Sequence, residues 1–106
     1  MSRIGRVADE FIIPKAFYQL VCTDNDQSVA IPWGGRCVSI YCRDKDARIN
    51  FNSSSGSSTY FIAAGQSMDF KLPWVYNEDG NTHIHGRNNA SGQEAVLMIT
   101  SYWENT

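Results

Sequence analysis

The amino-acid sequence predicts an all-β protein: an antiparallel β-sandwich, jelly-roll-like, with an irregular N-terminal arm. Three observations lead to this prediction. Apolar and polar residues alternate along most of the apolar segments, which is the period of a half-buried strand. Turn-forming residues such as Gly, Asp and Asn separate these segments every eight to twelve positions. No stretch of about a dozen residues shows the periodicity of an amphipathic helix.

The first half of the chain supplies three expected strands, at residues 17–22, 36–42 and 47–51. In each of them the side chains alternate between two faces. The strand 17–22 groups Tyr18, Leu20 and Cys22 against Phe17, Gln19 and Val21, and the strand 36–42 groups Val38, Ile40 and Cys42 against Cys37, Ser39 and Tyr41. In 47–51, Ala47, Ile49 and Phe51 are expected to face the interior. The next segment, "NSSSGSS" at 52–58, has low complexity and is expected to be a flexible, solvent-exposed hairpin tip.

The second half supplies four more expected strands, at residues 58–63, 66–72, 81–87 and 94–103. The alternation is cleanest in 66–72, where Met68, Phe70 and Leu72 are expected inside. An open sheet of this size would expose an apolar face and unpaired edges, so two packed sheets are expected. Residues 1–15 are largely polar and contain Pro14, which predicts an arm ahead of a single sandwich domain at 16–106.

Composition excludes several classes of function. The net charge of the 106 residues is −2 and no cluster of Lys and Arg occurs, which argues against a nucleic-acid partner. No apolar run approaches membrane-spanning length, and the N-terminus lacks the apolar core of a signal peptide, so no membrane association is expected. The three cysteines form no CxxC pair and are expected to be reduced thiols, as in a protein made in a reducing cytoplasm.

No catalytic motif is present. The chain has no G-x-S-x-G sequence, and Asp24 and Asp26 fall in a turn, where aspartate is favoured for conformational reasons. The sequence therefore predicts no catalytic residue, no cofactor and no enzymatic activity.

His83 and His85 are the one candidate metal pair. Two residues apart on a strand, they project to the same face about 7 Å from each other. Cupin-type β-barrels present two imidazoles in this way, and a cupin-like metal-binding enzyme is therefore one alternative. Such a site also needs an acid shortly afterwards and a third histidine, and this chain has neither. The expected metal site is none, with His83 and His85 as weak candidates.

Large aromatic residues support two further interpretations. Trp33 and Trp74 each follow a proline, so they lie near strand ends and could belong to a sugar-binding platform. A carbohydrate-binding module, for example of a tail or fibre, is thus the other alternative. The favoured interpretation is that aromatic and apolar residues of the arm and loops anchor contacts between subunits. The interface candidates are Ile4, Phe11, Ile12, Trp33, Trp74, Tyr76 and Trp103.

The second half of the chain also resembles a known group of proteins. The pieces "YFIAAGQSMDFKLP" and "IHGRNNASGQEAVLMITSYWE", roughly residues 58–104, are similar to small β-sandwich structural proteins of tailed bacteriophages. The matching pieces are 63–65, Arg87 with 90–92, and the final strand through Trp103 and Glu104. The resemblance implies a non-catalytic virion protein, such as a capsid decoration (cement) protein. Its implied partners are the major capsid protein, other virion proteins and further copies of itself, for example as a trimer. Its implied location is the virion, after assembly in the bacterial cytoplasm.

Overall fold

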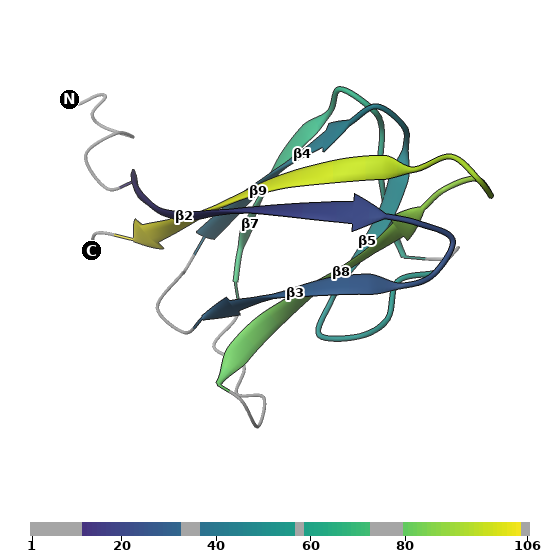
Figure 1. The fold of residues 1–106 in the computed structure, drawn as a ribbon. Helices are drawn as coiled ribbons and strands as arrows, with labels where there is room; N and C mark the ends of the chain where they lie inside the picture. Colours follow the sequence, from purple (N-terminus) through teal and green to yellow (C-terminus); the bar gives the residue numbers. More distant parts are fainter. Residues whose placement is uncertain (1–11, 33–36, 57–58, 73–79, 105–106) are drawn as a thin grey trace.

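The computed structural model describes residues 12–32, 37–56, 59–72 and 80–104, and these form two antiparallel sheets packed face to face (Figure 1). The expected β-sandwich is confirmed. No helix occurs in these ranges, so none of the described residues forms a helix that could span a membrane. The strands are β2 (Ile12–Cys22), β3 (Gln27–Pro32), β4 (Cys37–Arg43), β5 (Ala47–Phe51), β6 (Tyr60–Ile62), β7 (Ser67–Lys71), β8 (Asn81–Asn88) and β9 (Ala95–Glu104).

The strand order interleaves distant parts of the sequence. One sheet has the order β2-β9-β4-β7 and the other β3-β8-β5-β6. Four antiparallel pairs are nested around the β5–β6 connection: β5 with β6, β4 with β7, β3 with β8 and β2 with β9. Apart from this β5–β6 connection, all connections between consecutive described strands cross from one sheet to the other. Figure 1 shows the first and last described strands, β2 and β9, side by side.

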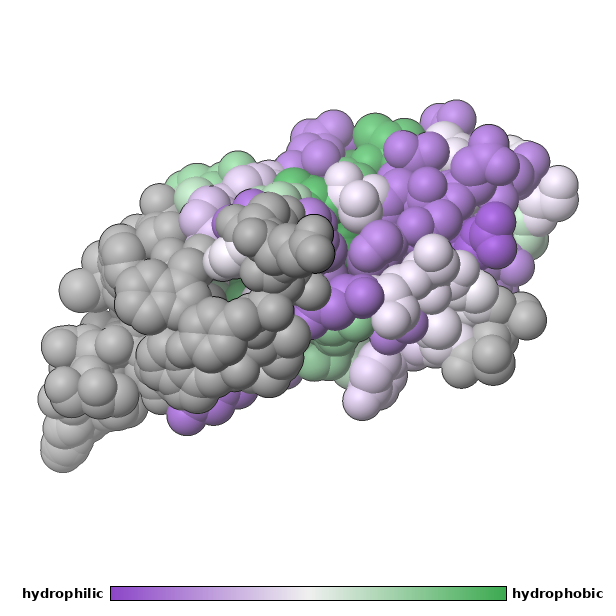
Figure 2. All heavy atoms as spheres, turned by 90° about the horizontal axis from the view of Figure 1, so that it is seen from below, coloured by the Kyte–Doolittle hydropathy of each residue, from purple (hydrophilic) through white to green (hydrophobic). Residues whose placement is uncertain are grey.

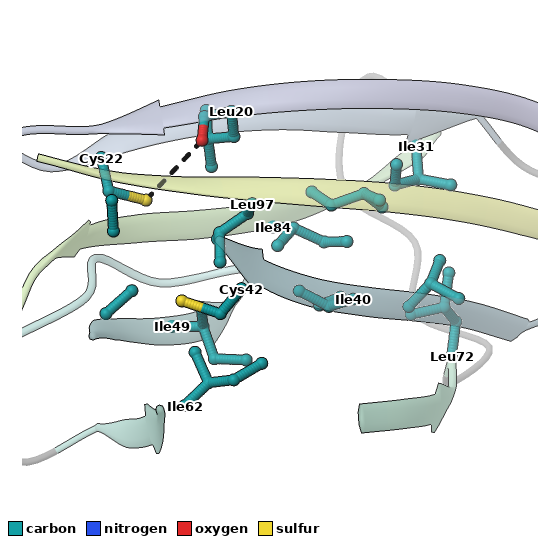
Figure 3. Packing of buried hydrophobic residues seen from close by; sticks show 14 residues of the cluster. Leu20, Cys22, Ile31, Ile40, Cys42, Ile49, Ile62, Leu72, Ile84 and Leu97 are labelled. Atoms are coloured by element: carbon teal, nitrogen blue, oxygen red, sulfur yellow. Dashed lines mark hydrogen bonds between the residues drawn. The ribbon is translucent and has the colours of Figure 1, made fainter. Parts of the chain in front are cut away.

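The core lies between the sheets and consists mainly of aliphatic side chains (Figure 3). Because side chains alternate across a strand, each strand contributes every second residue to it. The fully buried aliphatic residues are Val38, Ile40, Leu97 and Ile99 from one sheet and Ile49, Ile62 and Ile84 from the other, with Ile31 also covered. The inward positions expected from the sequence are confirmed, and Tyr18, Phe51, Met68 and Phe70 pack against this core while only partly buried.

Two strands, β2 and β3, differ from the sequence-based expectation. Strand β3 was not expected, because "QSVAIP" ends in a proline and places small residues on its outer face. Strand β2 begins at Ile12, inside the segment 1–15 assigned to the arm. Pro14 is tolerated there because β2 is an edge strand of the described sheet and its register shifts between Pro14 and Ala16. Residues 1–11 of the expected arm lie outside the described residues.

Candidate functional site

The two outer faces of the sandwich differ in chemistry. The outer face of β3-β8-β5-β6 is polar: along β8, residues Asn81, His83, His85 and Arg87 alternate with buried neighbours. Arg48 and Asn50 of β5 lie directly beside Arg87 and His85. Figure 2 views the molecule from the side of β3 and β8, and hydrophilic residues cover most of the described surface there.

His83 and His85 share this outer face, as their spacing predicts. Their ring centroids are 6.4 Å apart, with an interplanar angle of 44°. The alternate residues of β8, including Thr82, Ile84 and Gly86, occupy the buried face. A metal centre inside the sandwich, as a cupin-like enzyme would use, requires imidazoles on the inner face, and β8 presents these two on the outer one.

His85 is held by an aspartate that the sequence assigned only to a turn. Its Nδ1 lies 2.8 Å from Oδ2 of Asp26, in the β2–β3 connection. The other carboxylate oxygen of Asp26 accepts hydrogen bonds from Ser55, from the backbone N at 2.8 Å and from Oγ at 2.5 Å. Three segments that are distant in the sequence therefore meet at one carboxylate, and we call Asp26, Ser55 and His85 the Asp26 cluster.

The hydrogen bonds of the Asp26 cluster determine the ionisation of Asp26 and the tautomer of His85. Partial burial would raise the pKa of Asp26, but the hydrogen bonds donated by Ser55 and His85 outweigh this effect and lower it. Asp26 is consequently ionised at neutral pH and can only accept hydrogen bonds. Nδ1 of His85 must then carry a proton, and in the neutral ring Nε2 holds the lone pair.

Ser55 corrects one expectation from the sequence. The segment 52–58 was expected to be exposed throughout, but Ser55 retains only 5% of its accessible surface. Its hydroxyl and backbone N–H are both used by Asp26, which replaces the solvent contacts of a free loop. Nothing in the low-complexity composition of this segment distinguishes Ser55 from its neighbours, so only the fold could identify it.

A second acidic residue closes the same end of the sandwich. The carboxylate of Asp24 accepts hydrogen bonds from Nδ2 of Asn88 at 2.6 Å and from the backbone N of Gly92 at 2.9 Å. Its backbone O accepts one from Arg87. The bonds from Asn88 and Gly92 lower the pKa of Asp24. Asp24 thus ties the β2–β3 connection to the β8–β9 turn, which explains why an acid occupies this position.

These two aspartates predict an acid-sensitive stability. Because the folded-state pKa of each lies below the ordinary value of 3.8, the unfolded chain takes up protons first as the pH falls. Their contribution is therefore complete above about pH 5 and is lost as the pH falls through the folded-state pKa values. Urea unfolding of the wild type and of the double variant Asp24→Asn/Asp26→Asn, between about pH 5 and pH 2.5, should show a shallower decline for the variant.

Glu94→Gln is the matched control, because Glu94 is exposed and belongs to neither aspartate's contacts. It should leave the decline of the unfolding free energy with pH unchanged. Equal slopes for the wild type and the double aspartate variant would show that these carboxylates do not stabilise the folded state.

The outer face of the other sheet carries an apolar patch over β2, β9 and β4, beside the charged residues Arg43 and Asp69. Pairing of β2, β9 and β4 places Val21 beside Val96 and Met98 beside Tyr41, with Phe17 on the same side of β2. We call these five residues the apolar face. Phe17 exposes 74% of its surface, and Val21, Tyr41 and Met98 are also exposed. Single exposed apolar residues are ordinary, but a contiguous group on one sheet marks an interaction surface.

The interface candidates predicted from the sequence cover this surface only in part. Of the interface candidates, Ile4, Phe11, Trp33, Trp74 and Tyr76 lie outside the described residues. The backbones of Ile12 and Trp103 pair at the ends of β2 and β9, where Ile12 is opposite Glu104 and Trp103 is opposite Ile13. The apolar face lies on the same two strands. Alternation predicted that Phe17 and Val21 share a face of their strand. The fold shows that this face is the outer one, and the register of β2, β9 and β4 places both residues in one patch.

The described tyrosines do not form one sugar-binding platform. Tyr41 lies on the apolar face, whereas Tyr60 is in β6 of the opposite sheet, where its ring packs 5.9 Å from that of Phe70. Tyr18 packs against the core, and Tyr102 lies on β9, in the same sheet as Tyr41. Trp33 and Trp74, the two tryptophans proposed for such a platform from the sequence, lie outside the described residues.

The buried thiols are poor nucleophiles. Burial, with a smaller contribution from Cys42, raises the pKa of Cys22 to about 12. Burial together with Asp46 and Asp44 raises the pKa of Cys42 to about 11. Both thiols are therefore protonated at neutral pH and serve as core side chains. Among the described residues, no group of three or more His, Cys, Asp or Glu side chains is arranged to hold a metal ion.

Comparison with known proteins gave no relative: no family model, curated protein or solved structure matches the chain.

Proposed function

We propose that this chain is a non-catalytic structural protein of a bacteriophage virion, a capsid decoration protein that acts by binding its neighbours. The observation that carries the proposal is the apolar face. Sheets of a sandwich commonly keep one face in the core and the other polar. Here the outer face of one sheet carries Phe17, Val21, Tyr41 and Met98 exposed together, which is costly in water unless a partner covers them.

The strand pairing supports the viral part of the proposal. Four antiparallel pairs nested about the β5–β6 connection correspond to one long hairpin rolled into two sheets, and we infer that the sandwich is a jelly roll. Jelly rolls occur in viral capsid domains, and also in lectins and cupins. The fold is therefore compatible with a virion protein, and the choice among these classes depends on the surfaces.

The resemblance to phage sandwich proteins involves two turns with defined conformations. Gly65, in the "AAG" turn between β6 and β7, has φ +86°, and Gly92, in the "ASG" turn between β8 and β9, has φ +75°. Side chains rarely adopt this left-handed region, so glycine is favoured at both positions. The backbone N of Gly65 donates to O of Cys42, and that of Gly92 donates to Asp24. These glycines are thus structural requirements of the crossings between sheets.

The partner proposed for the apolar face is a second copy of the chain. The middle row of the face, Gln19, Met98 and Tyr41, is uncharged, whereas Arg43 and Asp69 lie in the two flanking rows, on the side away from β2. Two copies can therefore centre their contact on the middle row without placing like charges there. Sheets also pack well on one another, with interdigitating side chains. A self-complementary contact of this kind gives a closed symmetric oligomer.

The oligomer is tested by measuring molar mass with sedimentation velocity over a range of concentrations. The wild type should exceed the 11.9 kDa of one chain. Truncating a central aromatic of an interface costs about 2 kcal/mol or more. The double variant Phe17→Ser/Tyr41→Ser should therefore weaken association by well over tenfold and remain folded.

Phe61→Ser is the matched control, because Phe61 is exposed to 42%, close to the 41% of Tyr41, but lies on the opposite sheet. It should associate like the wild type. A wild type that stays monomeric at all concentrations, or equal dissociation by Phe61→Ser, would contradict the proposed contact. The virion role has a separate test: the protein should co-sediment with purified heads of the phage whose genome encodes it, and absence from the head fraction would remove this role.

A further inference from the structure

We propose that His83 and His85 form a surface site for one divalent transition-metal ion of borderline softness, such as Ni²⁺, Cu²⁺ or Zn²⁺. The site lies on the outer face of β8, on the sheet opposite the apolar face, so it is independent of the proposed assembly contact. Imidazole nitrogen is a preferred ligand of these ions. Both rings project from one strand with a single residue between them, which brings two ligands to one position.

The distance between the rings suits a shared ion. A metal–nitrogen bond is about 2.0–2.1 Å long, so two imidazoles bound to one ion have centroids about 5–6 Å apart. The observed separation is 6.4 Å. A small rotation about the side-chain bonds of His83 would bring the rings into this range while His85 keeps its contact with Asp26.

The contact between His85 and Asp26 supports the metal site independently of the histidine spacing. Metal-binding histidines almost always donate the second ring N–H to a carboxylate or a carbonyl, which fixes the tautomer and the ring orientation. His85 already makes such a contact, with Nδ1 at 2.8 Å from Oδ2 of Asp26. Its Nε2 is consequently the nitrogen left to bind an ion. The arrangement matches the carboxylate–histidine pair of metal sites before any metal is bound.

The supporting carboxylate is itself fixed. Ser55 donates both its backbone N–H and its hydroxyl to Oδ1 of Asp26, and Ser55 is buried. The side chain of His85 is only 18% exposed, so water competes little for its contact with Asp26. A ligand whose orientation is fixed in advance loses less conformational freedom when the ion binds.

The donor set also selects the ion. Two imidazoles supply nitrogen ligands, and no third His, Cys, Asp or Glu joins them among the described residues, so water completes the coordination. Mg²⁺ and Ca²⁺ require mainly oxygen ligands and are not expected to bind. The site proposed is therefore a two-histidine surface site, distinct from the three- and four-ligand centres of metalloenzymes.

The test uses the untagged full-length chain in a Cys37→Ser background, because Cys37 is a partly exposed thiol that could bind metal on its own. Calorimetric titration with Ni²⁺ should show one ion per chain, and titration with Mg²⁺ should show none. His83→Asn and His85→Asn should each abolish saturable Ni²⁺ binding. Asp26→Asn should weaken it by about 10–100-fold, the usual effect of losing a supporting carboxylate.

Asp24→Asn is the matched control, since it removes a carboxylate from the same β2–β3 connection that does not contact His85. It should bind Ni²⁺ like the parent. Because the chain has only two histidines, NMR of the unmutated protein gives a second readout: substoichiometric Cu²⁺ should broaden the imidazole signals of both. Unbroadened imidazole signals, Ni²⁺ binding that persists in both histidine variants, or equal affinities for Asp26→Asn and Asp24→Asn would overturn the proposal.

Discussion

Replacing Leu97 by alanine is expected to lower the free energy of unfolding by about 2–5 kcal/mol. Leu97 is fully buried near the start of β9, with Leu20 and Cys42 as its neighbours on β2 and β4. Its side chain projects between the sheets, where residues from both layers meet (Figure 3). Truncation removes apolar contacts and leaves a cavity that the paired strands on either side cannot fill by moving. Urea denaturation monitored by tryptophan fluorescence measures the change.

Met98→Ala is the control for this prediction, because Met98 is the next residue of the same strand and lies exposed on the opposite side. Measured at a concentration where the chain is monomeric, it should cost less than about 1 kcal/mol. Similar losses for Leu97→Ala and Met98→Ala would mean that the interior of the sandwich is not packed around Leu97 as described.

Replacing Gly86 by alanine is expected to destabilise the fold by about 1–3 kcal/mol, although it adds a single methyl group. Gly86 lies on the inner face of β8, and a Cβ atom there would be 2.8 Å from Sγ of Cys22. It would also be 3.0 Å from Cδ1 of Leu97 and 3.2 Å from Cδ2 of Leu20. All three side chains come from the opposite sheet, so the methyl group would push the two layers apart.

Two variants make this prediction specific. Gly56→Ala adds the same methyl group where no atom lies within 4 Å, and it should change the unfolding free energy by no more than about 0.5 kcal/mol. Cys22→Ala removes the sulfur nearest to the added carbon, so the double variant Cys22→Ala/Gly86→Ala should be more stable than the sum of the single changes predicts. Additive effects in this double-mutant cycle would show that the close approach of Gly86 and Cys22 does not limit packing.

The alternation of apolar residues was sufficient to predict most of the strands and, in 47–51 and 66–72, the inner face. In 47–51, for example, Ala47 and Ile49 were expected inside and are fully buried. This prediction succeeds because a strand with one buried face needs an apolar residue at every second position, and that pattern is visible locally in the sequence. Strand β3 escaped prediction because it ends in Pro32 and lies at an edge, where a proline is tolerated and the alternation is weak.

The candidate site was predictable only in part. The spacing of His83 and His85 determines that they share a face, and the structure confirms it. The partner of His85 was not predictable, because Asp26 precedes it by 59 residues and aspartate in a turn has an ordinary local explanation. The contact of Ser55 with Asp26 was not predictable either, because the composition of its segment indicates only flexibility.

By itself, the sequence determined that the protein is all-β, which residues of each expected strand share a face, and that two histidines project from one side of a strand. These are consequences of the two-residue period, which acts over a few neighbouring positions. The tertiary structure alone decided which strands are neighbours. That pairing joined Phe17, Tyr41 and Met98 into one face and brought Asp26 to His85. Such contacts depend on register and sheet packing across the whole chain, and local patterns do not specify them.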